Sequence, residues 1–258
     1  QALRTACIRM PDREACAAQL AAAMGNASLP AKCSILEVLG AMNGAKALAT
    51  LGRAAKDPSP ELQDAASRLL GDWMSVDAAP VLLDLAKTAP EAKYRVRALR
   101  GYIRLVRQFP VPDAQRADMC RAALDAATRN EEKALVLEVM ERYPSIDMLK
   151  LAVDAGKTPA MKNDAARVAL AIAQKLGGQS VDVQTLLNQI GQAPVKLEIV
   201  KARYGANDKF KDVTDVIRKA AGGLPLLVLP SPQYNTAFGG DPVSGVVKTL
   251  IIEYRMDV

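Results

Sequence analysis

Histidine is missing from this 258-residue chain. Its absence removes imidazole ligands for metals, Ser–His and Cys–His nucleophile pairs, and the commonest general base of enzymes. The sequence also lacks GxGxxG, GxxxxGK(S/T) and GxSxG motifs, which mark dinucleotide sites, phosphate-binding loops and serine nucleophiles. We therefore expect a protein that is not an enzyme and that holds no metal ion and no cofactor.

Aromatic residues are scarce, at 4% of the chain, whereas half of the residues are hydrophobic and alanine is frequent. This balance favours close-packed helices over a large sheet. The sequence has no run of about 18 apolar residues, so we predict no membrane span. The net charge of +6 is too mild to identify a nucleic acid as the partner. The first residue is Gln1 and not Met, and the sequence shows no basic and apolar leader. We therefore expect a processed chain or a part of a longer protein.

Cysteine is also rare, and none of the four residues has the CxxC spacing of a metal site. Cys7 and Cys16 lie almost symmetrically about Pro11-Asp12, a pair that stops one helix and caps the next. If helices flank this turn as a hairpin, the two thiols face each other. They would then form a disulfide, which requires an oxidising compartment, or they would serve as two small core residues.

An apolar pattern recurs through most of the chain. Gly40, Gly71 and Gly101 each follow a leucine-rich stretch and are spaced by 31 and 30 residues. Each repeat consists of an apolar helix, a turn rich in Pro, Asp or Asn, and a second apolar helix. We predict a helix at 2–10, then pairs at 12–25 with 31–42, 44–56 with 60–74, 77–88 with 91–108, 113–129 with 131–142, and 145–155 with 160–177, and a last helix or turn at 182–191. Because each pair exposes apolar surface at both ends, the pairs must stack into a solenoid.

The apolar period changes from helical to alternating at Ala193-Pro194. Alternation predicts strands near 195–201 and 250–258, and a short apolar run predicts another at 224–229. Between them we expect a short helix within 212–223, capped by Thr214 and ended by Gly222-Gly223. The predicted domains are therefore a helical repeat domain, residues 1–193, and a small β-rich α+β module, residues 194–258.

The segment from Glu91 to Phe109 carries a basic stripe. At about 100° per residue, five cations share one arc of the helix, and most of the remaining surface is apolar. These cations are Lys93, Arg97, Arg100, Arg104 and Arg107. The stripe predicts a binding site for an acidic protein surface, a phosphate backbone or an anionic glycan.

The alternative is a solvated stripe that is paired with acids of adjacent helices. Candidate acids are Glu61, Asp64, Asp72, Glu132 and Glu138. One period before Arg97, Arg100 and Arg104 stand Ser67, Leu70 and Met74, so the stripe does not continue on the preceding helix. This interruption argues against a nucleic-acid track.

A second candidate site is the loop 231–245. It brings Tyr234, Asn235, Phe238 and Asp241 close to several glycines. Loops of this length are often functional. Asp241 and Asn235 alone supply too few oxygens for Ca²⁺, and FGGDP also suits a plain turn.

The leucine-glycine second helices and the turn Asp57-Pro58 resemble HEAT-like repeats, including the bacterial PBS lyase HEAT-like repeats. This resemblance covers about 190 residues and implies an α-α superhelix of about five helix pairs, whose second helices line a concave face. The run 98–105 is similar to arrays in large secreted bacterial proteins, often beside sugar-directed domains. The C-terminal pattern, with Tyr204-Gly205 and Phe238-Gly239, resembles the β module that ends a mitochondrial DnaJ-type co-chaperone.

These observations favour a non-catalytic interaction scaffold. Its expected partner is a protein, or another domain of the parent chain, rather than nucleic acid. The alternatives are a carbohydrate-directed accessory domain, a nucleic-acid binder, and a HEAT-fold enzyme such as a bilin lyase or an alkyl-base glycosylase. The resemblance implies a cell-envelope or secreted location, with the cytoplasm as the alternative.

Overall fold

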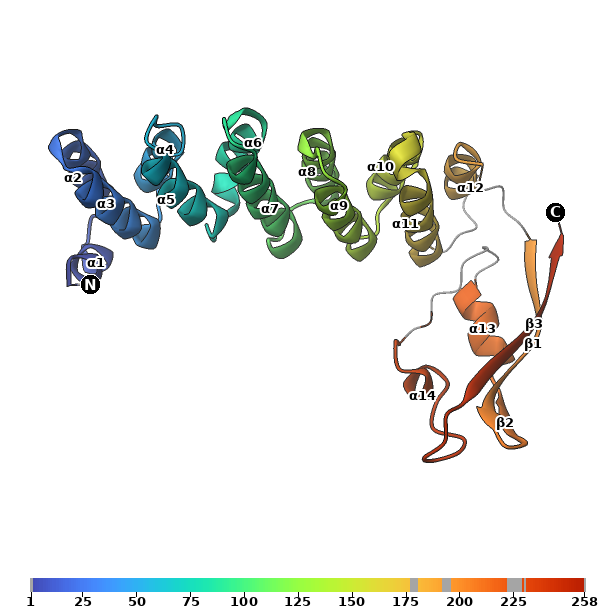
Figure 1. Ribbon diagram of the computed structural model, residues 1–258. Coiled ribbons are helices and arrows are strands. Elements are labelled where there is room, and N and C mark those ends of the chain that lie inside the picture. Colours follow the sequence, from blue (N-terminus) through green and yellow to red (C-terminus); the bar gives the residue numbers. More distant parts are fainter. Residues whose placement is uncertain (1, 177–180, 192–195, 222–228, 230, 258) are drawn as a thin grey trace. The chain divides into compact units, whose positions relative to one another are not determined.

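The computed structural model describes residues 2–176, 181–191, 196–221, 229 and 231–257 (Figure 1). The chain divides into two compact units, Gln1–Val139 and Met140–Val258. The predicted domain boundary at 193/194 lies outside the described residues, so that division stays a prediction. The secondary structure does change from helix to strand across this gap, between Asn188 and Lys196.

The first unit is built from helices that follow one another in pairs (Figure 1). A single helix, α1 (Ala2–Arg9), precedes them. The pairs are α2 (Arg13–Ala23) with α3 (Leu29–Met42), α4 (Ala45–Ala54) with α5 (Pro60–Gly71), α6 (Ala79–Thr88) with α7 (Ala92–Gln108), and α8 (Asp113–Ala126) with α9 (Asn130–Arg142), whose last residues belong to the second unit. Short 3-10 turns, Met24–Asn26 and Val76–Ala78, adjoin α2 and α6. The predicted pairs are confirmed.

Polar caps and prolines set the helix boundaries. Asp12 accepts a hydrogen bond from the Ala15 amide (2.8 Å) at the start of α2, and Ser59 caps α5, where Pro60 is the first helical residue. The start of α4 is capped from the preceding pair, because the Glu14 carboxylate accepts from the amides of Ala45 (2.8 Å) and Lys46 (3.0 Å). A glycine is required at position 44, since its φ is +99° and a Cβ there would lie 2.3 Å from Glu14 Oε1.

The repeated glycines allow the second helices to approach one another closely. A Cβ on Gly40 of α3 would meet Leu69 of α5 at 2.8 Å, and a Cβ on Gly101 of α7 would meet the Gly71 Cα of α5 at 3.0 Å. Leucines beside these glycines are buried, including Leu39, Leu70 and Leu99. The leucine-glycine pattern therefore places α3, α5 and α7 side by side in one layer of the solenoid.

The helical part of the second unit consists of α10 (Ile146–Gly156), a 3-10 turn (Pro159–Met161), α11 (Lys162–Lys175) and α12 (Val181–Asn188). Helices α10 and α11 form the fifth pair among the described residues, and they bury Met148, Leu149, Val168 and Ile172. None of the described helices of the chain combines the length and the apolar composition needed to cross a bilayer.

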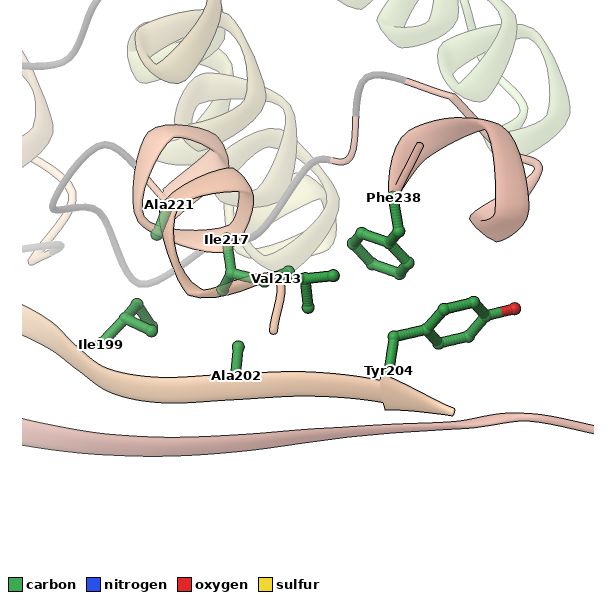
Figure 2. Close-up of a cluster of buried hydrophobic side chains, with 7 residues drawn as sticks. All are labelled: Ile199, Ala202, Tyr204, Val213, Ile217, Ala221 and Phe238. Carbon is green, nitrogen blue, oxygen red and sulfur yellow. The ribbon is translucent and has the colours of Figure 1, made fainter. Parts of the chain in front are cut away.

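A three-stranded antiparallel sheet with order β2-β1-β3 follows. Its strands are β1 (Lys196–Ala206), β2 (Lys209–Asp212) and β3 (Thr249–Asp257). Helix α13 (Thr214–Ala221) packs on β1, and its Ile217 and Ala221 meet Ile199, Ala202 and Tyr204 (Figure 2). Phe238, which follows the short helix α14 (Tyr234–Ala237), completes this core. The predicted α solenoid followed by a small β module is confirmed.

Several details of the module differ from the sequence prediction. The sequence pattern did not predict β2, and the loop 231–245 contains α14. Thr214 is the first residue of α13, and its hydroxyl binds β1 instead of capping the helix, accepting from the Ala202 amide (2.9 Å). Asp212 accepts a hydrogen bond from the Thr214 amide (2.8 Å). Hydrogen bonds with the side chain and with the backbone of Thr214 lower the pKa of Asp212. The run 224–228 and Gly222-Gly223 lie outside the described residues.

Candidate functional site

A groove of about 420 Å³ lies between α5 and α7 in the first unit. We call it the α5–α7 groove. Cations dominate its wall, and Asp72 is the acid that accompanies them. Its lining residues are Arg68, Gly71, Asp72, Lys93, Val96, Arg97, Arg100, Gly101 and Arg104. Four of the five residues of the predicted stripe therefore meet in this groove.

Helix α7 is amphipathic in the way that its sequence predicts. Its apolar side buries Tyr94, Leu99, Tyr102, Leu105 and Val106, and its basic side faces the groove. Arg95 stands outside the stripe, and it donates to the carbonyls of Ala89 (2.8 Å) and Pro90 (3.0 Å). Arg95 thus closes the turn between α6 and α7 rather than adding to the groove.

Arg97 joins α7 to the preceding second helix, α5. Its Nη1 donates to Ser67 Oγ (2.8 Å), to Asp64 Oδ1 (3.0 Å) and to the Asp64 carbonyl (3.1 Å). The guanidinium also lies 5.9 Å from the centroid of the Tyr94 ring. Each described hydrogen bond of this side chain uses Nη1, and a guanidinium has five N–H donors in all.

Arg104 holds the C-terminal end of α5. Its Nη2 donates to the carbonyls of Gly71 (2.9 Å) and Trp73 (2.6 Å), and its Nη1 donates to Gln108 Oε1 (3.1 Å) and to Met74 Sδ (3.2 Å). Carbonyls at a helix C-terminus lack partners within the helix, and the helix dipole favours a cation there. Arg104 is therefore a C-terminal cap supplied by the next repeat.

Arg100 reaches in the opposite direction, to α9. Its Nε and Nη2 both lie 2.9 Å from Glu132 Oε1. The Glu132 side chain is 1% exposed, whereas that of Arg100 is 50% exposed. Arg129 Nε approaches the other carboxylate oxygen at 3.5 Å. Arg100 neutralises a buried carboxylate and still presents half of its surface to solvent.

The two remaining stripe residues are exposed. Lys93 Nζ lies 3.1 Å from Glu91 Oε2 and 4.7 Å from the centroid of the Tyr94 ring. Its hydrogen bonds with Glu91 and Tyr94 raise the pKa of Lys93. Arg107 lies near the end of α7 and is not one of the residues that line the groove.

Arg68 is the fifth cation of the groove, and it is not among the residues predicted from the sequence. This residue of α5 forms an ion pair with Glu37 of α3. A signal for it exists, because the ion pairs between repeats join residues about one repeat apart. Glu37 and Arg68 are 31 residues apart, Arg100 and Glu132 are 32 apart, and Asp64 and Arg97 are 33 apart.

The residues of the predicted loop site make contacts with other residues of the β module. The Tyr204 hydroxyl donates to Asn235 Oδ1 (2.8 Å), and the Phe238 ring lies 4.8 Å from the Tyr204 ring. Tyr234 meets Tyr204 edge to face at 6.3 Å. Asp241 pairs with Lys248 (2.8 Å), which lowers the pKa of Asp241. The four predicted residues are brought together, and each fastens the loop to the module.

The predicted cysteine pair is also brought together. Cys7 is buried at the end of α1, and Cys16 is half-buried in the first turn of α2. Burial raises the pKa of the Cys7 thiol, and the neighbouring Cys16 adds to this effect. Both are free thiols in the structure. Among the residues that the structure describes, no group of three or more His, Cys, Asp and Glu side chains is placed to hold a metal ion.

Residues 17–102 match the family model described as HEAT repeats. The matched segment runs from α2 into α7, and it includes α5 and the first part of α7. No curated protein matches the chain, and no solved structure matches it. The match and the stacked helix pairs support a HEAT-like solenoid.

Proposed function

We propose that the HEAT-like solenoid is a non-catalytic interaction scaffold, and that the α5–α7 groove binds an acidic segment of a protein partner. The observation that carries this proposal is the groove itself, which gathers five cations from two adjacent repeats into about 420 Å³. Stacked repeats commonly use such extended surfaces for binding.

The groove keeps binding capacity although its cations already have partners. The side chains of Lys93 and Arg100 are 56% and 50% exposed. Arg100 engages one carboxylate oxygen, and Arg97 uses one of its nitrogens for its described hydrogen bonds. Because a guanidinium offers five donors in a planar fork, an incoming carboxylate can bind without displacing the internal acids.

The internal contacts also hold the binding groups in place. Arg97 and Arg104 are fastened to α5, and Arg100 is fastened to α9. Side chains that are ordered before binding lose less conformational entropy when the partner arrives. The arrangement therefore favours recognition of a specific short segment over a diffuse attraction to negative charge.

A phosphate backbone fits this surface less well than an acidic peptide. The preceding helix α5 places Ser67 and Leu70, both buried, where α7 has Arg97 and Arg100. A nucleic-acid track needs cations on several consecutive helices. The basic stripe of α7 therefore does not continue at the equivalent positions of α5.

A display library of random peptides, selected on the full chain, tests this function. We expect enrichment of Asp- and Glu-rich peptides. Their affinity should fall by at least about tenfold for the double variant Lys93→Glu/Arg100→Gln, because each lost charge contact is worth about 1 kcal/mol. Glutamine at position 100 keeps a donor for Glu132.

The matched control is Lys87→Glu, which makes the same charge reversal at an exposed position on α6. The proposal fails if the selected peptides are not acidic, or if the control weakens binding as much as the groove variant. Tighter, salt-dependent binding of a DNA duplex than of any selected peptide would instead favour the nucleic-acid alternative.

A further inference from the structure

Helix α1 is held to the rest of the first unit through Cys7. Among the described side chains of α1, Cys7 alone is buried, and it is 5% exposed. Leu3 and Met10 are exposed, and Ile8, which follows Cys7, is half-buried. Helix α1 packs against α2 and α3, so this thiol lies at the junction of three helices.

The turn between α1 and α2 sets the position of the second thiol. Helix α1 ends with the Met10 amide donating to the Cys7 carbonyl (3.3 Å), and α2 begins at the Asp12 cap, whose carbonyl accepts from the Cys16 amide (3.2 Å). The last turn of one helix therefore faces the first turn of the next. The two helices are in contact, so the two cysteines are neighbours, and Cys16 is the one that solvent can reach.

We propose that Cys7 and Cys16 form a reversible intramolecular disulfide that fastens α1 to the first helix pair. The proposal concerns the N-terminal end of the solenoid and is independent of the α5–α7 groove. The pairing is favoured because the turn between α1 and α2 is short and the two cysteines lie on the turns that flank it.

The oxidant is a soluble disulfide such as oxidised glutathione. The half-buried Cys16, as the thiolate, attacks one sulfur of the oxidant, and the other glutathione leaves as a thiolate. Cys7 then loses its proton to solvent, attacks Cys16 Sγ and releases the second glutathione. One disulfide forms, one disulfide breaks, and two protons and two electrons pass from the protein to two glutathione molecules.

The second step uses the less accessible of the two thiols. Burial raises the pKa of the Cys7 thiol, with the neighbouring Cys16 adding to the effect, so the thiolate of Cys7 is rare at neutral pH. Cys120 lies much deeper, and burial raises its pKa to about 12. We therefore expect Cys120 to stay reduced under conditions that oxidise the pair.

The test uses the full chain in a buffer of oxidised and reduced glutathione, followed by acid quenching, unfolding and alkylation with N-ethylmaleimide. We expect a peptide in which Cys7 and Cys16 are crosslinked, with a mass lower by about 2 Da than that of the two thiols, and alkylated Cys33 and Cys120. Alkylation of both Cys7 and Cys16, or a crosslink from Cys16 to Cys33, would overturn the proposal.

Two variants sharpen the result. Cys33→Ser should leave the crosslink intact, because this half-buried residue of α3 takes no part in the reaction. Cys7→Ser should stop the reaction at Cys16 bound to glutathione, since the resolving thiol is gone. If the unmodified chain also stops at that mixed disulfide, the two thiols do not pair and the proposal is wrong.

A second measurement tests the mechanical role of the bond. Amide hydrogen exchange of α1 should slow by about tenfold in the disulfide form, because helix ends that bury little surface open readily and a crosslink restrains them. The groove residues of α7 provide an internal reference and should exchange equally in the two forms. Equal exchange of α1 in both forms would show that the bond does not fasten this helix.

Discussion

Four arginines of α7 have the same chemistry and different surroundings. Arg95 binds two carbonyls of the preceding turn, and Arg97 binds an acid and a serine on α5. Arg104 binds carbonyls at the end of α5, and Arg100 binds a buried acid on α9. Arginine suits these contacts because its fork reaches several acceptors at once. The surroundings therefore decide which of these residues fasten the fold and which of them can also bind a partner.

Replacing Arg100 should destabilise the first unit more than replacing Lys93. Arg100→Ala leaves the Glu132 carboxylate, 1% exposed, with only the longer contact to Arg129. We expect a loss of about 2 kcal/mol in unfolding free energy, at the low end for a broken buried pair because Arg100 itself is half exposed. Urea unfolding, followed by circular dichroism, measures this loss.

Lys93→Ala is the matched control, since Lys93 and Glu91 are both about half exposed. We expect it to change the unfolding free energy by less than about 0.5 kcal/mol. A further variant, Arg100→Ala/Glu132→Leu, should recover most of the loss, because it removes the buried charge as well. Equal losses for Arg100→Ala and Lys93→Ala would contradict this account of Glu132.

At the scale of elements, glycine decides how closely the second helices pack. A helical glycine normally costs stability relative to alanine, yet this pattern keeps one in α3, α5 and α7. Position 101 explains the exception, because it faces the backbone of Gly71. A methyl group placed between two backbones has no flexible side chain to displace.

Gly101→Ala should therefore be destabilising, and Gly71→Ala should not. The new Cβ at position 101 would lie 3.0 Å from the Gly71 Cα and 3.2 Å from its carbonyl oxygen, whereas a Cβ at position 71 meets nothing nearer than Arg97 Cγ at 3.5 Å. We expect a loss of about 1–3 kcal/mol for Gly101→Ala, and a change within about 1 kcal/mol for Gly71→Ala. Thermal unfolding of the two variants compares them directly, and similar melting temperatures would refute the close-approach argument.

The elements that sequence reasoning missed are those held by tertiary contacts or by an unfamiliar turn. Strand β2 has four exposed residues and no apolar alternation. It follows Asn207 and Asp208, both at positive φ, which form the two-residue turn of the β1–β2 hairpin. An Asn-Asp pair is typical of two-residue hairpin turns, so these residues could have predicted the hairpin. Thr214 looked like a cap because its hydrogen-bond partner, Ala202, is distant in sequence.

At the scale of the whole molecule, the repeat period was the most informative feature of the sequence. It placed Ser67 and Met74 one period before Arg97 and Arg104, and these residues are in direct contact in the structure. Helix positions follow from such a period because each repeat meets its neighbours in the same register. Two of the five candidate acids named from the sequence, Asp64 and Glu132, do pair with Arg97 and Arg100. The period alone did not select them among the five, since the choice of acid also depends on side-chain reach and burial.

The division into two compact units predicts that each unfolds separately. Trp73, the one tryptophan of the chain, is buried in the first unit, and its fluorescence reports on that unit. Phe238→Ala removes a buried ring from the core of the β module, which should cost about 3 kcal/mol. We expect this variant to leave the urea midpoint of Trp73 fluorescence unchanged and to accelerate amide exchange at Ala202 and Ile217.

Gly101→Ala provides the reciprocal case. It should lower the midpoint of Trp73 fluorescence and leave the exchange of Ala202 and Ile217 unchanged, because those amides belong to the second unit. The stability of a repeat array is approximately a sum of local contributions. A substitution therefore destabilises mainly the repeats around it, unless an interface couples them to the rest of the chain. If either variant shifts both probes together, the units unfold as one, and the free energies measured for the groove variants would then describe the whole chain.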